Sequence, residues 1–286
     1  MRTLFKQRGL WAAGLVLTLM VGCKKETDNA MPTPVAETNC QIGRQSDNDV
    51  GSNDFVFNPQ GFVTRYTRTY KDDQGKTVAD ISDLVYNAQG LLERLTSKGP
   101  ANFEVFSYTN GLLSKIEVNG GGKKVYQWDV TTNAQKQITA MKGTSFDKDN
   151  YEDFSSVLTY DGQGYLIKSE ITDTALGKVA IRNESSGYKA GLKDFRRTLK
   201  GWPIDVMQFF YYYGDFGSLS GQGPQGVVTA YSAYDDKGNI GNTFVKEAEE
   251  TAVYKANSKQ FVTDATYTNT LNKKTRTLTH TYSNCN

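Results

Sequence analysis

The nine residues "YDGQGYLIK" at positions 160–168 are the clearest copy of a unit that recurs along the chain. An aromatic residue leads into a short polar stretch and a Gly; two apolar residues follow the Gly, and a basic residue stands in the fourth position after it. Aromatic residues are typical of strands, Asn, Asp and Pro favour bends, and Gly supplies a positive φ. Each copy therefore predicts a β-hairpin. The other copies are "FNPQGFVTR" (57–65), "YNAQGLLER" (86–94), "YTNGLLSK" (108–115), "YKAGLK" (188–193), "YDDKGNI" (234–240) and "YKANSKQFV" (254–262).

The remaining sequence also favours antiparallel sheet. The stretch "KTRTLTHTY" at 274–282 alternates with period two, which places its four Thr residues on one face. No segment shows sustained helical amphipathicity. We predict an all-β domain over residues 40–286, an antiparallel meander of about a dozen strands built from repeated hairpins and curled toward a barrel or half-barrel.

Alternation within the units predicts which side chains share a face. We expect the residues one and five places after each Gly to face the core, and those two and four places after it to face outward. The fourth position is basic in the four clear copies and could form a stripe that binds anionic glycan or lipid headgroups. Because acids such as Glu93 lie between these residues, we favour an ordinary solvated face. The stripe residues are Arg65, Arg94, Lys115 and Lys168.

The repeated unit resembles the YD repeats of RHS-type proteins, whose units read roughly Tyr-Asp-x-x-Gly-Arg-Leu. The literal dipeptide occurs here at Tyr160-Asp161 and Tyr234-Asp235. Together with its N-terminal signal, the chain is similar to uncharacterised Bacteroidetes-type lipoproteins with degenerate units of this kind. RHS proteins wind many units into a shell, and this chain has few, so the resemblance implies hairpin architecture and no particular activity.

Residues 1–22 have the organisation of an export signal. A basic start precedes an apolar run, Leu10–Val21, which is too short to span a bilayer. The following Met20-Val21-Gly22-Cys23 resembles a bacterial lipobox, which implies a lipoprotein signal peptide and a lipidated Cys23. The alternative is an ordinary secretory signal with an incidental Cys.

Residues 23–39 are polar, with two Pro residues and no apolar period, and are predicted to be a flexible tether. The segment "CKKETD" at 23–28 loosely resembles the signals that send lipoproteins to the cell surface. We therefore expect a protein anchored by lipid to the outer membrane, on its periplasmic or cell-surface face.

Two cysteines remain, Cys40 and Cys285, at the two ends of the predicted domain. Two thiols that bracket an exported domain suggest a disulfide. The alternative, a nucleophilic or metal-binding Cys, lacks nearby partners, because His280 is the only histidine.

Charge is nearly balanced in the mature chain. Residues 1–22 contain three of the 33 basic residues and none of the 31 acidic ones, so 30 basic and 31 acidic residues remain, a net charge of −1. Such a balance suggests neither a nucleic-acid partner nor an anionic membrane surface. We expect no cofactor and no bound metal.

Three short motifs favour ordinary roles. The segment "GQGPQG" (221–226) has the letters of a dinucleotide fingerprint but is followed by a β-branched, alternating stretch, so a loop is favoured. The segment "DKDNYED" (147–153) collects oxygen ligands suited to calcium but lacks an EF-hand's Gly and distal Glu, so an acidic loop is favoured. A lone His280 is expected to pack or hydrogen-bond.

The segment 192–226 interrupts the hairpin rhythm and concentrates aromatic residues. Exposed aromatics bind sugar rings and fill protein interfaces, whereas the same residues could fold over the sheet and plug its core. We favour the plug and keep the aromatics as a possible ligand site. They are Trp202, Phe209, Phe210, Tyr211, Tyr212 and Tyr213.

For function, the sequence favours a non-enzymatic binding or structural module at the envelope, which recognises glycan or protein. No catalytic residues can be assigned. A hydrolase acting on polysaccharide, with two carboxylates in a groove, and a carrier of an apolar ligand stay open as alternatives.

Overall fold

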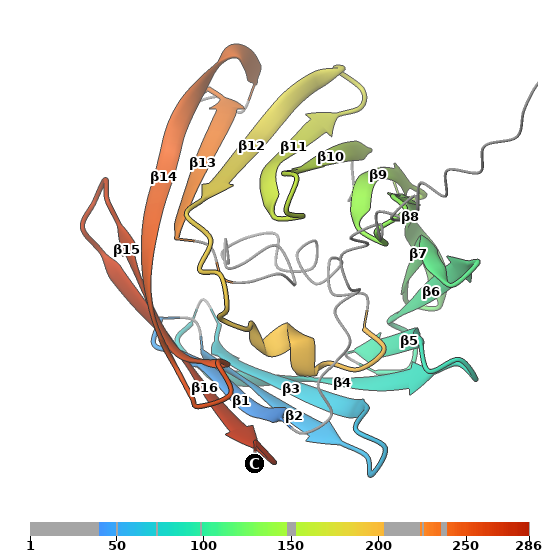
Figure 1. Ribbon diagram of the computed structural model, residues 1–286. Coiled ribbons are helices and arrows are strands. Elements are labelled where there is room, and N and C mark those ends of the chain that lie inside the picture. The colour runs from blue at the N-terminus through green and yellow to red at the C-terminus, as the bar shows by residue number, and fades with distance from the viewer. Residues whose placement is uncertain are drawn as a thin grey trace, which may run out of the picture. The chain divides into compact units, whose positions relative to one another are not determined.

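The computed structural model describes residues 40–49, 51–72, 74–97, 99–147, 153–202, 224, 226–235 and 239–285. These residues form a closed antiparallel barrel in which the strands follow one another in chain order and β1 pairs with β16 (Figure 1). The strands are β1 Gln41–Asp47, β2 Gly51–Phe57, β3 Val63–Lys71, β4 Thr77–Tyr86, β5 Leu92–Ser97, β6 Phe103–Thr109, β7 Leu112–Gly120, β8 Lys123–Thr132, β9 Ile138–Ser145, β10 Phe154–Tyr160, β11 Leu166–Asp173, β12 Lys178–Ser186, β13 Val227–Tyr234, β14 Ile240–Ala256, β15 Val262–Asn269 and β16 Thr275–Ser283.

The all-β antiparallel meander is confirmed, whereas the expected dozen strands and the half-barrel are wrong: the barrel is closed and has 16 strands. The β8–β9 and β15–β16 hairpins do not match the repeated unit, because their turns carry no Gly. Lys136, between β8 and β9, and Lys273, between β15 and β16, hold positive φ angles of 64° and 61°.

Closure joins the two ends of the described chain. In the β1–β16 pair, Gln41 lies opposite Ser283 and Gln45 opposite His280. Just outside this pair, Cys40 and Cys285 form the expected disulfide, with Cα atoms 4.2 Å apart. The bond therefore holds together the two strands that only tertiary folding brings side by side.

An Asx side chain organises the repeated turn. Oδ1 of Asn58 accepts hydrogen bonds from the backbone N–H groups of Gln60 and Phe62, at 3.1 and 3.0 Å, and Gly61 has a φ of 82°. The same pair of bonds recurs in the turns that begin at Asn87, Asp161 and Asn257. Such bonds satisfy turn amides that would otherwise need water, which explains the Asn or Asp at this position in these four turns.

The aromatic residue of the unit links neighbouring hairpins. The hydroxyl of Tyr86 donates to the carbonyl oxygen of Val63 at 2.9 Å, and that of Tyr108 donates to Leu92 at 2.8 Å. In each case the acceptor lies two residues after the positive-φ residue of the preceding unit. Further bonds of this type run from Tyr160 to Ile138, from Tyr188 to Leu166 and from Tyr282 to Val262.

One prediction about faces is wrong. The residues two places after Gly point into the core and are buried: Val63, Leu92, Leu113 and Leu166. In each hairpin a β-bulge leaves one extra residue between the second and fourth positions, as between Val63 and Arg65. Because a bulge reverses the alternation, the second position faces inward while the fourth still faces outward.

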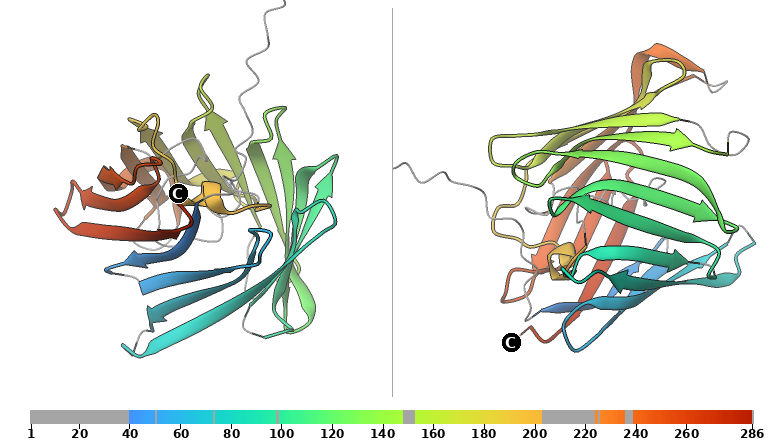
Figure 2. Two further views of the ribbon diagram at one scale, coloured as in Figure 1. Left: turned by 60° about the horizontal axis from the view of Figure 1, so that its bottom comes forward. Right: turned by 90° about the vertical axis from the view of Figure 1, so that its right-hand side faces the viewer.

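The connection from β12 to β13 differs from the others. Its first part, residues 187–202, contains the short 3₁₀ helix η1, Phe195–Thr198, and we call these residues the strap. Turns after even-numbered strands lie at one end of a sequential meander, and we call it the strap end. The opposite end is the far end. In the right-hand view of Figure 2, η1 and the C-terminus lie at the same end of the barrel.

The main core fills the barrel at the strap end. It unites inward side chains of β1 to β11 with Phe195, Leu199 and Trp202 of the strap. Within the described residues, no helix is both long and apolar enough to cross a bilayer.

Candidate functional site

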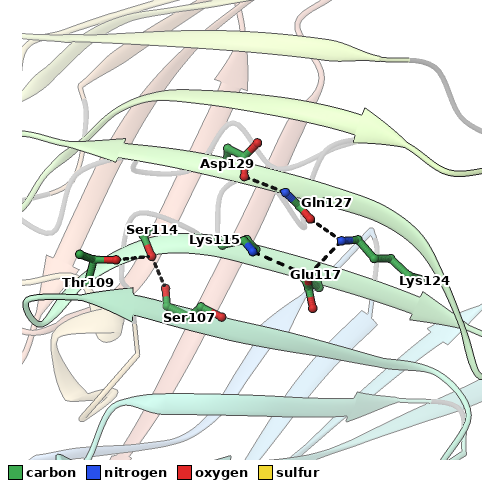
Figure 3. Close-up of polar contacts among 8 residues, drawn as sticks. All are labelled: Ser107, Thr109, Ser114, Lys115, Glu117, Lys124, Gln127 and Asp129. Carbon is green, nitrogen blue, oxygen red and sulfur yellow. Dashed lines mark hydrogen bonds and ion pairs between the residues drawn. The ribbon is translucent and has the colours of Figure 1, made fainter.

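The outer wall of the barrel carries many ion pairs and hydrogen bonds. On β7 and β8, Nζ of Lys124 lies 3.0 Å from Oε1 of Glu117, and Nζ of Lys115 lies 3.9 Å from the same oxygen (Figure 3). Lys124 also hydrogen-bonds Gln127, whose amide donates to Asp129 at 2.8 Å. These side chains face outward, because the residues that alternate with them belong to the core.

Similar pairs surround the barrel, and we call them the wall ion pairs. Arg65 lies 2.6 Å from Asp83, and both side chains are more than half exposed. Glu170 contacts both Lys168 and Arg182; although burial acts to raise the pKa of Glu170, these two hydrogen bonds lower it below its ordinary value. The others are Arg44–Asp54 and Lys246–Glu249.

This geometry also places the predicted basic stripe. Arg65, Lys115 and Lys168 face outward in ion pairs with acids, and the guanidinium of Arg94 lies over the Phe103 ring at 3.7 Å. Three of the four residues therefore have an acidic partner, and the four form no continuous cationic surface, in agreement with an ordinary solvated face.

The strap is fixed to turns on opposite sides of the strap end. At one side, the backbone N–H of Lys193 donates to the carbonyl of Gln260 at 2.7 Å, and Val262 donates back to Lys193 at 3.0 Å. At the other, Leu92 donates to the carbonyl of Gly201 at 2.8 Å. Between these anchors, η1 packs its apolar side chains into the barrel. The strap thereby crosses the strap end.

Trp202 is a packing residue in this structure. Its side chain is 8% exposed, and its indole N–H donates to the hydroxyl of Tyr86 at 2.7 Å. Tyr86 in turn donates to Val63, so Trp202 extends the chain of bonds between hairpins. Burial raises the pKa of Tyr86, which keeps the hydroxyl protonated as a donor. The other predicted ligand residues, Phe209, Phe210, Tyr211, Tyr212 and Tyr213, lie outside the described residues, so their role stays a prediction.

The buried strap also contains an ion pair. Nε of Arg196 lies 2.6 Å from Oδ1 of Asp194, and the same oxygen accepts the backbone N–H of Arg196. Phe195 stacks on His280 with ring centroids 5.2 Å apart. His280 is buried, and its Nε2 lies 3.4 Å from the amide nitrogen of Gln45. The histidine is thus packed and hydrogen-bonded, as expected.

Toward the far end, the interior becomes polar. The guanidinium of Arg276 lies between two carboxylates, 3.6 Å from Asp47 and 3.9 Å from Glu250, and over the ring of Tyr267. One cation that bridges two acids is an arrangement suited to holding β1, β14 and β16 together. The sequence offered no signal for it, because the three residues are distant along the chain.

Glu104 is a buried acid in the same region. It points inward from β6 between Leu95 and Val118, and its Oε2 atom is shielded from solvent without a hydrogen-bond partner among the described residues. Burial raises the pKa of Glu104 to about 8. The carboxyl is therefore mostly protonated at neutral pH and could donate as well as accept a hydrogen bond.

The remaining motifs lie largely outside the described residues. Of the segment "GQGPQG", only Pro224 and Gly226 are described, and of "DKDNYED", only Asp147 and Asp153. Oδ1 of Asp153 accepts the backbone N–H of Ser145 at 2.7 Å. No group of three or more metal-ligating side chains occurs in the part of the chain that the structure describes.

No protein-family model and no curated protein sequence matches the chain. Solved structures do resemble it. A porin-like protein from Bacteroides uniformis has a TM-score of 0.54 and 12% identity, over 85% of this chain and 98% of that one. A porin-like protein from Bacteroides vulgatus has a TM-score of 0.51 and 10% identity, over 84% and 98%. A Photorhabdus luminescens Tc holotoxin pore matches at a TM-score of only 0.28 and 13% identity, over 76% of this chain and 13% of that one. The first two likenesses show the fold alone, a closed antiparallel β-barrel.

Proposed function

We propose that the protein is an envelope lipoprotein whose barrel stands in water beside the membrane and acts as a non-enzymatic binding or structural module. In this proposal, residues 1–22 are removed as a signal peptide, Cys23 carries the lipid, residues 23–39 form the tether, and the domain begins at Cys40. The partner is a glycan or another envelope protein.

The wall ion pairs are the observation that carries this proposal. A barrel that spans a bilayer presents an apolar band to lipid and a polar interior, and a charged Arg or Lys on the lipid face costs about 2–4 kcal/mol at mid-membrane. This barrel differs from that pattern: charged side chains occur on its wall together with exposed apolar ones such as Val157 and Val253, and its interior is apolar at the strap end. Its wall carries ion pairs on β1–β4, β7, β8, β11, β12 and β14, and its main core is apolar.

The likeness in fold to two porin-like proteins supports the envelope part of the proposal. A β-barrel can form either in water or in a membrane, because strand pairing is the same in both. The side chains on its outer and inner faces distinguish a barrel in water from one in a membrane.

Membrane fractionation tests the proposal. We expect metabolic labelling with an alkyne fatty acid to modify the full-length protein and to be lost in Cys23→Ser. We also expect residues 24–286, exported behind an ordinary cleavable signal, to be released from membranes by a high-salt wash, which weakens binding through surface charges. A barrel that spans the bilayer would stay in the membrane pellet after the wash, and that result would refute a water-exposed wall.

Ligand binding needs a separate test. The aromatic run Phe209–Tyr213, which is the alternative to the core plug, is the candidate binding site, so Tyr212→Ala should lose a glycan-array signal that the wild type gives. A matched change, Tyr70→Ala, replaces a tyrosine of strand β3 and should keep the signal. Equal binding by both variants would remove the aromatic run from the proposal.

A further inference from the structure

The chain enters and leaves the barrel at the strap end. β1 begins at Gln41, directly after Cys40, and β16 ends at Ser283, directly before the disulfide partner Cys285. These ends lie beside the turns that follow even-numbered strands. Any segment that joins the barrel to Cys23 must therefore leave from the strap end, and along the chain this end is the nearest part of the barrel to the proposed lipid.

Charge is unevenly divided between the two ends. The described loop residues at the strap end include seven basic and two acidic residues, a net charge of +5, whereas those at the far end include three basic and five acidic residues, a net charge of −2. Two further acids of the strap-end connection, Asp205 and Asp215, lie outside the described residues. The strap-end residues are Lys136, Lys189, Lys193, Arg196, Arg197, Lys200, Lys259, Asp161 and Asp194, and the far-end residues are Lys76, Lys273, Lys274, Asp49, Asp72, Asp147, Asp153 and Asp235.

Most of the strap-end cations are not neutralised by acids. Lys136, Lys189 and Lys259 are exposed, and in the described part of the chain none of them has an acidic partner. Lys200 donates to the carbonyl of Gln60 at 3.3 Å, which leaves its charge uncompensated. Several cations on the wall, by contrast, have acidic partners, such as Asp83 for Arg65 and Glu170 for Lys168.

We propose that the strap end is a docking surface for anionic lipid headgroups, on which the tethered protein rests with its far end directed away from the membrane. The orientation rests on the proposed lipid anchor at Cys23, but the affinity of the surface for lipid does not. Ammonium groups attract headgroup phosphates as point charges, and each Lys or Arg close to an anionic surface strengthens binding by about fivefold.

Vesicle sedimentation tests this surface without the lipid anchor. The protein is the mature chain 23–286 carrying Cys23→Ser, and the probes are vesicles of phosphatidylcholine alone or with about a third phosphatidylglycerol. The test variant is K189Q/K200Q/K259Q at the strap end. The matched control is K71Q/K76Q/K123Q, which removes three exposed lysines from the far end. Both variants keep Lys24 and Lys25 in the tether.

We expect the parent protein to sediment with anionic vesicles only, and more weakly as salt rises, because salt screens exposed charges. The strap-end variant should bind about a hundredfold more weakly, with an unchanged melting temperature, and the far-end control should bind like the parent. Equal weakening of both variants, binding to neutral vesicles, or no binding by the parent protein would each overturn the proposal. Failure of fatty-acid labelling at Cys23 would instead refute the anchor.

Discussion

Replacing Glu104 by Gln should raise the stability of the barrel relative to the wild type progressively as pH rises from 5 to 8. In the folded state, burial raises the pKa of Glu104 to about 8 from an ordinary value of 4.5. Between these two pH values the folded protein holds one more proton than the unfolded chain. The free energy of unfolding of the wild type therefore falls as pH rises through this window, and Gln, which does not ionise, removes that loss.

The magnitude follows from the width of the window. One pKa unit corresponds to about 1.4 kcal/mol, so the buried carboxyl costs the wild type about 1 kcal/mol at pH 5 and about 4 kcal/mol at pH 8. The stability difference between Glu104→Gln and wild type should grow by about 3 kcal/mol over this range. For a domain of this size, that is a relative shift in melting temperature of about 6–12 °C.

Differential scanning calorimetry of both proteins at pH 5, 6, 7 and 8 measures this difference. Burial of the amide itself adds a stability difference that is the same at each pH. The test is therefore how the difference between variant and wild type changes with pH. Glu93→Gln is the matched control, since Glu93 is exposed on the neighbouring strand β5. A flat difference for Glu104→Gln would show that the carboxyl is solvated or paired in the folded state, and would refute the reasoning.

Three further changes test the strap and the closure. Trp202→Ala should lower the free energy of unfolding by about 3–5 kcal/mol in urea titrations, because a buried ring and its bond to Tyr86 are lost; a loss below about 1 kcal/mol would contradict burial. Gly201→Ala should lower the free energy of unfolding by more than about 3 kcal/mol, since an added Cβ would lie 2.1 Å from a backbone oxygen of the β4–β5 turn. Gly75→Ala, at a similar φ in open space, should lower it by about 1 kcal/mol. Equal losses would refute the close approach of Gly201 to the turn. Cys285→Ser should lower the free energy of unfolding by up to about 5 kcal/mol, and reducing agent should have no further effect on the variant. A variant as stable as oxidised wild type would show that strand pairing alone holds the barrel closed.

The local features of the barrel were predictable because they depend on neighbours in sequence. Asn58, Asn87 and Asp161 mark turns, since a side chain two to four residues from an amide can reach it whatever the rest of the fold does. Alternation of residue type along the chain also marks strands, because it too depends only on neighbours in the sequence. The disulfide was predictable from export and from the positions of Cys40 and Cys285 at the ends of the domain.

Only the tertiary structure decided which residues face the core, how many strands close, and where charge collects. Bulges reversed the face of Leu92 and its equivalents, and a bulge depends on pairing with the partner strand. Trp202 became a core residue because the strap crosses the strap end and meets Tyr86, 116 residues earlier in the chain. Net charge near zero suggested no membrane surface, yet an alternating meander sends successive turns to opposite ends and so separates cations such as Lys189 from the acids of the far end. Composition is a sum over the chain, whereas an electrostatic surface depends on where the fold places each charge.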